Sequence, residues 1–419
     1  MIPKFIKIKQ TFPRPRVDDI AGRIEKELAQ MGLSEKILPG QKIAITAGSR
    51  GINNIPQILA IVAARVRELG GFPMAVSAMG SHGGGTPAGQ RDILASLGIT
   101  EETIGCPVIC SSDVTKLGVT PTHKIDVYCA KEAVEADGVI VINRIKCHTA
   151  FRAPQESGLL KMIGIGLGRV PGAEAIHSMG TEHMGQVILE LARIVMTKIN
   201  VLGGLAIVEN SYEETEGIYG LKPEEFEEQE AILLKKANGL LPRIPFERID
   251  LLIVNEMGKN YSGTGMDTNV IGRWRIPGVP DPGSPQVKRI AVLDLSEPSH
   301  GNANGIGLAD FTTKKLVNKI NFQATYLNCL TTGILNRVMI PIILENHRKV
   351  IETALKTLRL SDISQARVVR IKNTLHLEEM WVSENFREEI INTPGLEIVS
   401  QPMELRYNQD GDIQDCLEE

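Results

Sequence analysis

Residues 138–143, Gly-Val-Ile-Val-Ile-Asn, form a nearly continuous apolar run that leads directly into a loop holding His148. Two runs earlier in the chain, Lys42–Thr46 and Met74–Ser77, are also short and mainly apolar, and Ile55–Leu69 between them has helical spacing. Short apolar runs of this kind are typical of strands that are buried on both faces. Their alternation with helices predicts βαβ units, and therefore an α/β protein with mainly parallel sheets flanked by helices.

The length of the chain predicts two domains, because 419 residues exceed what one hydrophobic core ordinarily organises. The stretch 239–245 is rich in glycine and proline, which indicates a linker, and a new strand begins at Leu251. We therefore expect an N-terminal domain over residues 1–245 and a smaller domain over residues 246–419. Each should be built on a mainly parallel sheet, with the active site in the cleft between them. Within the second domain, residues 379–391 are expected to form a helix.

Composition disfavours several classes of partner. The net charge is −4 and no long run of Lys and Arg occurs, whereas nucleic-acid binding usually requires a basic stripe. No signal peptide or long apolar span is apparent, so we expect a cytoplasmic protein without a membrane partner. The six cysteines have no paired CxxC spacing, so neither a zinc cluster nor a disulfide framework is predicted. The expected partner is a small molecule, and a homo-oligomer is possible.

Three polar side chains follow the predicted strands of the first domain. Arg50 follows the first strand, His82 lies in a glycine-rich turn after the second, and His148 follows the third. Ligands of open α/β sheets bind at the carboxyl ends of the strands, so these side chains form one candidate site. Gly83 and Gly84 would leave backbone N–H groups accessible to an anion. The alternatives are a surface ion pair for Arg50, a histidine that helps to cap the following helix for His82, and a loop histidine bonded to the backbone for His148.

Lys161 lies among apolar and small residues, in the sequence Ser-Gly-Leu-Leu-Lys-Met-Ile-Gly at positions 157–164. Burying an ammonium group is costly unless the group is paired, neutralised or modified. The alternative is a lysine that extends its amine to solvent from a half-buried helix. His177 follows sixteen residues later, on the small-residue side of a predicted helix.

The second domain offers further polar loops after its strands. Lys259 follows the first of these strands, and a glycine-rich loop with Asp267 and Asn269 comes next. His300 follows another strand. These residues are candidates for substrate contact, and ordinary surface turns are the alternative.

These residues resemble those of the nickel-dependent lactate racemase family, whose members hold a nickel-pincer nucleotide. The likeness spans most of the chain: two α/β domains, an arginine turn at a strand end, a Gly-x-His loop, and a His loop followed by Ser-Gly-x-x-Lys. Lys161 and His177 have the sixteen-residue separation of that family, which is the most specific match.

The resemblance implies a role for each residue. Lys161 would be joined through a thioamide to the cofactor, a pyridinium mononucleotide that carries nickel, and His177 would be a nickel ligand. His82 and His148 would be the acid/base pair, and Arg50 would bind the substrate carboxylate. The residues expected beside the cofactor are Lys161, Arg50, Ser157, Gly158, Gly83 and Gly84. The residues expected to contact the substrate are Arg50, Lys259, Asp267, Asn269 and His300.

The implied activity is racemisation or epimerisation of a 2-hydroxy acid by transfer of a hydride to the cofactor and back. Inversion requires acid/base groups on both sides of the substrate, which two histidines from separate loops can supply. Two other readings remain open. One is a zinc-type hydrolase or lyase built on His82, His148 and His177, with Glu156 or Glu174 as the base. The other is a non-catalytic protein that binds a nucleotide or a metal.

Overall fold

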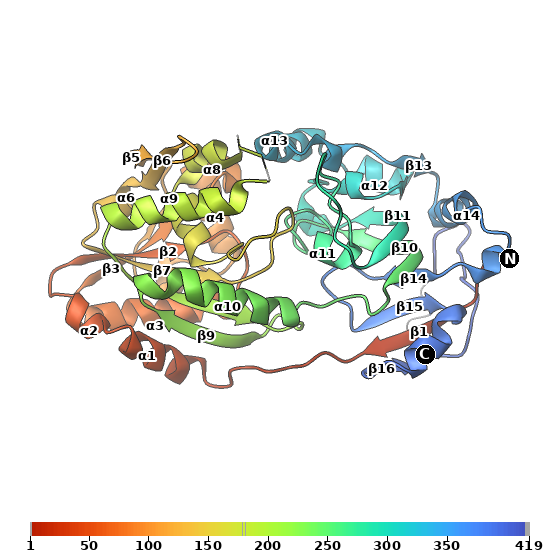
Figure 1. Ribbon diagram of the computed structural model, residues 1–419, viewed down its shortest axis with the longest axis horizontal. Helices are drawn as coiled ribbons and strands as arrows, with labels where there is room; N and C mark the ends of the chain where they lie inside the picture. The colour runs from red at the N-terminus through yellow and green to blue at the C-terminus, as the bar shows by residue number, and fades with distance from the viewer. Residues whose placement is uncertain (1, 178, 181, 415–419) are drawn as a thin grey trace. The chain divides into compact units, whose positions relative to one another are not determined.

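The computed structural model describes residues 2–177, 179–180 and 182–414 (Figure 1), without the side chains of His177, Asn328 and Thr331. The chain divides into two compact units. We call residues 13–241 the N-terminal unit, and residues 1–12 together with residues 242–419 the C-terminal unit. Each unit is built on its own sheet with helices packed against it, so the expected α/β class is confirmed.

The two units differ from the expected domains in their boundaries. The first strand, β1 (Phe5–Gln10), was expected in the first domain, but it pairs antiparallel with β15 (Glu379–Ser383) and β16 (Leu396–Ile398). The other boundary falls after Leu241 rather than after residue 245. Pairing between opposite ends of a chain depends on tertiary structure and leaves no local pattern. The expectation from the sequence therefore assigned β1 to the other domain.

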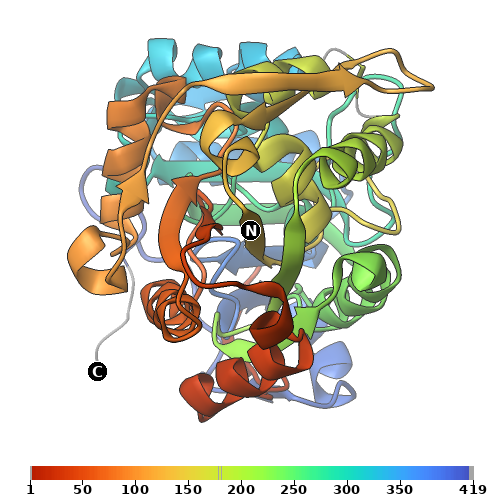
Figure 2. The same ribbon diagram turned by 90° about the vertical axis from the view of Figure 1, so that its left-hand side faces the viewer.

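The N-terminal unit is built on a six-stranded sheet in which all strands are parallel except the last. In sheet order, the strands are β4 (Val108–Ile109), β3 (Phe72–Ser77), β2 (Lys42–Ala47), β7 (Gly138–Arg144), β8 (Val201–Glu209) and β9 (Thr215–Leu221). A separate hairpin, orange in Figure 2, consists of β5 (Val114–Val119) and β6 (Asp126–Ala130).

Strand β7 shows why helices cover both faces of this sheet. Val139 and Val141 belong to one hydrophobic cluster, and Ile140 and Ile142 belong to another. Successive side chains of a strand point to opposite faces, so β7 is buried on both. The helices of the unit are α1 (Ile20–Gln30), α2 (Leu33–Lys36), α3 (Ile55–Glu68), α4 (Pro87–Ser96), α5 (Glu101–Ile104), α6 (Lys131–Val134), α7 (Leu159–Lys161), α8 (Arg169–His177), α9 (Met184–Lys198) and α10 (Phe226–Gly239).

The C-terminal unit has an eight-stranded mixed sheet in the order β13-β12-β11-β10-β14-β15-β1-β16. Its parallel part consists of β13 (Ile342–Leu344), β12 (Phe311–Thr313), β11 (Gln286–Leu295), β10 (Arg248–Met257) and β14 (Val368–Ile371). Its helices are α11 (Thr268–Ile271), α12 (Lys314–Asn318), α13 (Phe322–Thr332), α14 (His347–Thr357) and α15 (Arg387–Ile391).

The helix expected over residues 379–391 is wrong in its first half. Residues 379–383 form strand β15, in which Met380 and Val382 are buried on alternate positions, whereas residues 384–391 are helical, first as a 3₁₀ turn and then as α15. The short segment has an ambiguous pattern, and pairing with β14 and β1 selects the strand. Across the described residues, every helix is too short or too polar to cross a membrane.

Candidate functional site

Arg50 and His82 lie next to each other because β2 and β3 are parallel neighbours whose carboxyl ends meet at one edge of the sheet. Arg50 Nη2 is 3.2 Å from His82 Nε2. His82 Nδ1 lies 2.8 Å from the carbonyl oxygen of Met79 and 2.8 Å from Ser49 Oγ. A carbonyl oxygen can only accept, so Nδ1 carries the hydrogen of the neutral ring. His82 therefore directs the lone pair of Nε2 toward the guanidinium.

The turn that holds His82 requires glycine. Gly83 and Gly84 have φ of 66° and 65°, in the left-handed region that disfavours other residues. A Cβ atom on Gly83 would lie 2.4 Å from the backbone of Gly89, at the start of α4. The turn therefore fits tightly onto α4, which fixes the position of the imidazole.

His148 is held in the opposite tautomer. Its Nδ1 accepts a hydrogen bond of 3.2 Å from the backbone N–H of Ala150, so the hydrogen of the neutral ring is on Nε2. The ring packs against Phe151 with a centroid distance of 4.3 Å. Its loop is organised by Glu156, whose carboxylate accepts N–H groups of His148 at 2.5 Å and Ala153 at 3.2 Å.

Glu156 is buried, and burial raises its pKa. Its two hydrogen bonds to backbone N–H groups and the nearby Arg152 and Lys161 act in the opposite direction. Because both carboxylate oxygens are engaged by the loop, the carboxyl group has a local structural role in holding His148.

Lys161 is half-buried at the end of α7, and its amine has no hydrogen-bond or ion-pair partner among the described residues. Burial, followed by the positive charge of Arg50, lowers its pKa to about 8, and Glu156 opposes the shift. The pKa of Arg50 is itself lowered by surrounding protein atoms and by the charge of Arg144, although its side chain reaches solvent. Lys161 therefore lies within electrostatic reach of both the Arg50–His82 pair and the His148 loop. Its amine is partly neutral, and hence nucleophilic, near physiological pH.

Ser157 and Gly158 shape the turn before Lys161. The carbonyl of Ser157 accepts the N–H of Lys146 at 3.0 Å, and the carbonyl of Gly158 accepts Asn143 Nδ2 at 2.7 Å. A Cβ atom on Gly158 would lie 2.6 Å from Ile145 Cδ1. Close packing therefore explains the glycine at this position.

Glu230 was missed by the sequence analysis. This carboxyl group on α10 is buried, and it accepts the N–H groups of Leu159 and Leu160, the latter at 2.9 Å. Burial raises its pKa to about 7. It thus caps the short helix that ends in Lys161. The sequence does contain a signal, because Glu230 occupies the apolar stripe of α10 between Phe226 and Leu233.

His177 is the last residue of α8, and its side chain lies outside the part of the chain that the structure describes. The start of α8 is fixed by Arg169, which is fully buried, donates to the carbonyl of Asp113 at 2.6 Å and pairs with Glu132 at 2.8 Å. Glu174 is an exposed residue of the same helix. Within residues 2–177, 179–180 and 182–414, apart from the three side chains not described, no three His, Cys, Asp or Glu side chains are placed to hold a metal ion.

The candidates of the C-terminal unit lie after β10 and β11. Lys259 Nζ donates to the carbonyl of Gly263 at 2.5 Å, and its backbone N–H donates to Ser299 Oγ at 2.8 Å. His300, next to Ser299, is exposed and ends the turn with a φ of 47°. Ser299 therefore connects the loops of Lys259 and His300.

Asp267 and Asn269 have a shared local role. Asp267 is the N-cap of α11, and its Oδ1 accepts both the backbone N–H and the Nδ2 of Asn269 at 2.9 Å. Both residues are buried. These contacts fix the loop, as expected for a cap.

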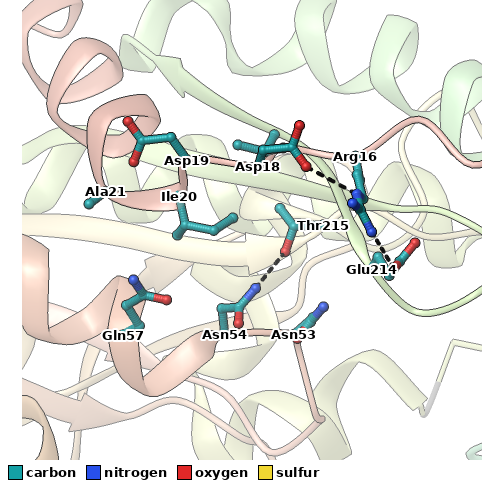
Figure 3. Close-up of a pocket in the computed structure, with 11 residues that line it drawn as sticks. Arg16, Asp18, Asp19, Ile20, Ala21, Asn53, Asn54, Gln57, Glu214 and Thr215 are labelled. Carbon is teal, nitrogen blue, oxygen red and sulfur yellow. Dashed lines mark hydrogen bonds and ion pairs between the residues drawn. The ribbon is translucent and has the colours of Figure 1, made fainter.

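The N-terminal unit also has a polar cavity of about 440 Å³ (Figure 3). Asn54 Nδ2 lies 3.4 Å from Thr215 Oγ1 there. Asn53 donates its N–H to Glu209, which pairs with Arg144. The cavity is lined by Arg16, Val17, Asp18, Asp19, Ile20, Ala21, Asn53, Asn54, Gln57, Glu214 and Thr215. None of the candidate residues lines it.

Comparison with known proteins shows which fold this chain resembles. A family model described as a domain of unknown function (DUF362) matches residues 43–219, which span β2 to most of β9. The structure of the lactate racemase apoprotein from Thermoanaerobacterium thermosaccharolyticum is similar, with a TM-score of 0.52 and 12% sequence identity, over 88% of this chain and 98% of that chain. At this identity the likeness concerns the fold, which is therefore racemase-like. No curated protein matches the chain.

Proposed function

We propose that this protein is an isomerase, a racemase or epimerase of 2-hydroxy acids, that uses a nickel-pincer nucleotide attached to Lys161. The observation that carries the proposal is the amine of Lys161. It is half-buried, lacks a partner among the described residues, and has a pKa lowered to about 8. Conversion to an amide-like linkage would remove the cost of burying its charge, so the residue fits covalent attachment. The racemase-like fold supports the same class.

The two histidines are suited to opposite tasks in one direction of the reaction. His82 offers the lone pair of Nε2, which can take the hydroxyl proton of the substrate. His148 carries a hydrogen on Nε2, which it can donate to the oxygen on C2 when the hydroxyl group forms again. Exchange of the two roles runs the reaction in the other direction. When bound, the cofactor would supply a hydride acceptor, which is needed because the hydrogen on C2 is too weakly acidic for a histidine to remove.

Arg50 would bind the substrate carboxylate, because its planar guanidinium suits a bidentate pair. Its position beside His82 would bring the C2 hydroxyl near that imidazole. His177 would provide the nitrogen ligand to nickel at the end of α8. An imidazole nitrogen is a suitable ligand for nickel.

The test is intact-mass spectrometry of the full chain produced in a host that synthesises the cofactor. Wild-type protein should carry a mass increment that peptide mapping places on the peptide containing Lys161, and Lys161→Arg should lose it. The loaded protein should then interconvert the enantiomers or epimers of at least one member of a panel of hydroxy acids. Unmodified Lys161 in such a host would contradict attachment. A loaded protein without turnover across the panel would instead favour a cofactor-binding protein.

A further inference from the structure

The C-terminal unit carries an exposed apolar surface on α13, on the turn after it, and on β13. We call this surface the α13–β13 face. Among the described residues, most of the large exposed hydrophobic side chains belong to this segment. They are Phe322, Tyr326, Leu327, Leu330, Leu335, Met339, Ile342 and Ile343, with exposed fractions between 41% and 68%. In Figure 1, α13 and β13 both lie along the upper edge of the C-terminal unit.

The residues of the face are continuous in the chain, from α13 through the turn that follows it to β13. Phe322 and Tyr326 lie one helical turn apart with a ring-centroid distance of 5.6 Å. The turn Leu335–Val338 packs against α13, and β13 follows it closely. Contiguous apolar patches of more than a few hundred square ångströms on a protein surface usually mark an interaction site.

The charge of the segment narrows the choice of partner. From Ile320 to Leu344 the sequence holds one charged residue, Arg337, and that side chain is buried and donates to the carbonyl of Trp274. A membrane-surface element normally carries Lys or Arg beside its apolar side chains, and a charged peptide needs a complementary charge. Residues 320–344 have no exposed basic side chain and no exposed charge of either sign. Two identical uncharged faces, by contrast, meet without repulsion.

The strand β13 offers a second contact between two copies. It is an edge strand of the sheet, so its outer edge pairs with no described strand. Ile342 donates its N–H toward the β12 side, to the carbonyl of Asp310 at 3.1 Å. Because backbone groups alternate in direction along a strand, the N–H and C=O of Ile343 point away from β12. Two such edges related by a twofold axis can exchange a pair of hydrogen bonds.

The area of the face is adequate for a dimer. Ile342 and Ile343 point to opposite sides of the sheet, so only one of them is counted. With roughly 200 Å² for each fully exposed large side chain, the remaining seven side chains present on the order of 750 Å². A standard interface buries about the same area on each partner. We propose that this face forms a twofold-symmetric homodimer, in which α13 packs against α13 and β13 pairs antiparallel with β13 of the second copy.

The first test is the molar mass of the full-length protein by light scattering over a series of concentrations. Wild type should be a dimer. Leu330→Glu should weaken dimerisation at least about tenfold, because it places a carboxylate in the interface. Ile391→Glu is the matched control, since Ile391 is 70% exposed and Leu330 is 68% exposed, but Ile391 lies outside the face. A wild-type monomer at every concentration, or a Leu330→Glu variant as dimeric as wild type, would overturn the proposal.

The second test examines the antiparallel pairing of β13 with β13 of the second copy. Paired residues on such a twofold axis have Cα atoms about 5.5 Å apart, within the range of a disulfide. Ile343→Cys should therefore form an intermolecular disulfide on treatment with diamide, while wild type and Ile391→Cys should not. Equal cross-linking of the two variants would contradict the arrangement. A monomeric protein that binds phosphatidylcholine vesicles, and loses this binding in Leu330→Glu, would assign the face to a membrane instead.

Discussion

Two lysines, one in each unit, differ in the surroundings of their amines: Lys259 lies in a loop after β10, and Lys161 lies at the end of α7. Lys259 in the C-terminal unit donates its amine to the carbonyl of Gly263, within its own loop. Lys161 in the N-terminal unit has an amine without a described partner and a pKa lowered to about 8. The first amine stabilises local structure, whereas the second is held in a state that costs stability. Such a cost is characteristic of functional sites, where reactivity is favoured over stability.

The largest expected effects concern the two histidines near Lys161. In loaded enzyme, His82→Ala and His148→Ala should each lower kcat by about 10²- to 10⁴-fold, because each removes a proton-transfer group. Cofactor loading should remain close to normal, as measured by intact mass. His300→Ala, in the C-terminal unit, should instead raise KM with little change in kcat if His300 contacts substrate only. Normal turnover in His82→Ala would refute the assignment of the acid/base pair.

The next effect concerns the cap of the Lys161 helix. Glu230→Ala should lower the free energy of unfolding by about 2–4 kcal/mol, because the N–H groups of Leu159 and Leu160 lose their buried acceptor. The rate at which a lysine-directed acylating reagent modifies Lys161 should change as well, because the turn that positions the amine loosens. Glu228→Ala on the exposed face of α10 is the control and should change neither quantity.

Glu230→Gln adds a pH test of the same cap. A carboxyl group with a pKa of about 7 in the folded protein contributes stability at acidic pH, and this contribution is lost as the pH rises from about 4.5 through 7. Gln keeps one acceptor oxygen without titrating. Unfolding in urea should therefore show this pH dependence in wild type and a flatter profile in Glu230→Gln. Identical profiles would show that Glu230 does not titrate in this range.

The smallest effects compare the two lysines directly, in protein without cofactor. Lys161→Met should stabilise the fold near neutral pH by about 1–2 kcal/mol, because it removes a partly buried charge. The gain should shrink as the pH rises from about 8 toward 10.5, where the wild-type amine becomes neutral in both states. Lys259→Met should destabilise by about 1 kcal/mol, through loss of its bond to Gly263. Urea titrations at several pH values measure the free energy of unfolding of both variants. Destabilisation by Lys161→Met would contradict the view that the amine of Lys161 costs stability.

The sequence by itself determined the α/β class and the grouping of Arg50 and His82 at one edge of a sheet. Apolar runs such as 138–143 specify strands buried on both faces, and parallel strands place their following loops together. The unusual setting of Lys161 was also visible, because a lysine among small and apolar residues is rare. The patterns that predict these features can each be read from short segments of the chain.

Tertiary structure decided the rest. Strand β1 joined the C-terminal sheet through pairing with β15, and that pairing also made a strand of residues expected to be helical. The cap of the Lys161 helix comes from Glu230 on α10, whose bond to the N–H of Leu160 joins residues 70 positions apart. Hydrogen bonds and strand pairs of this kind are chosen by proximity after folding, so no local periodicity encodes them.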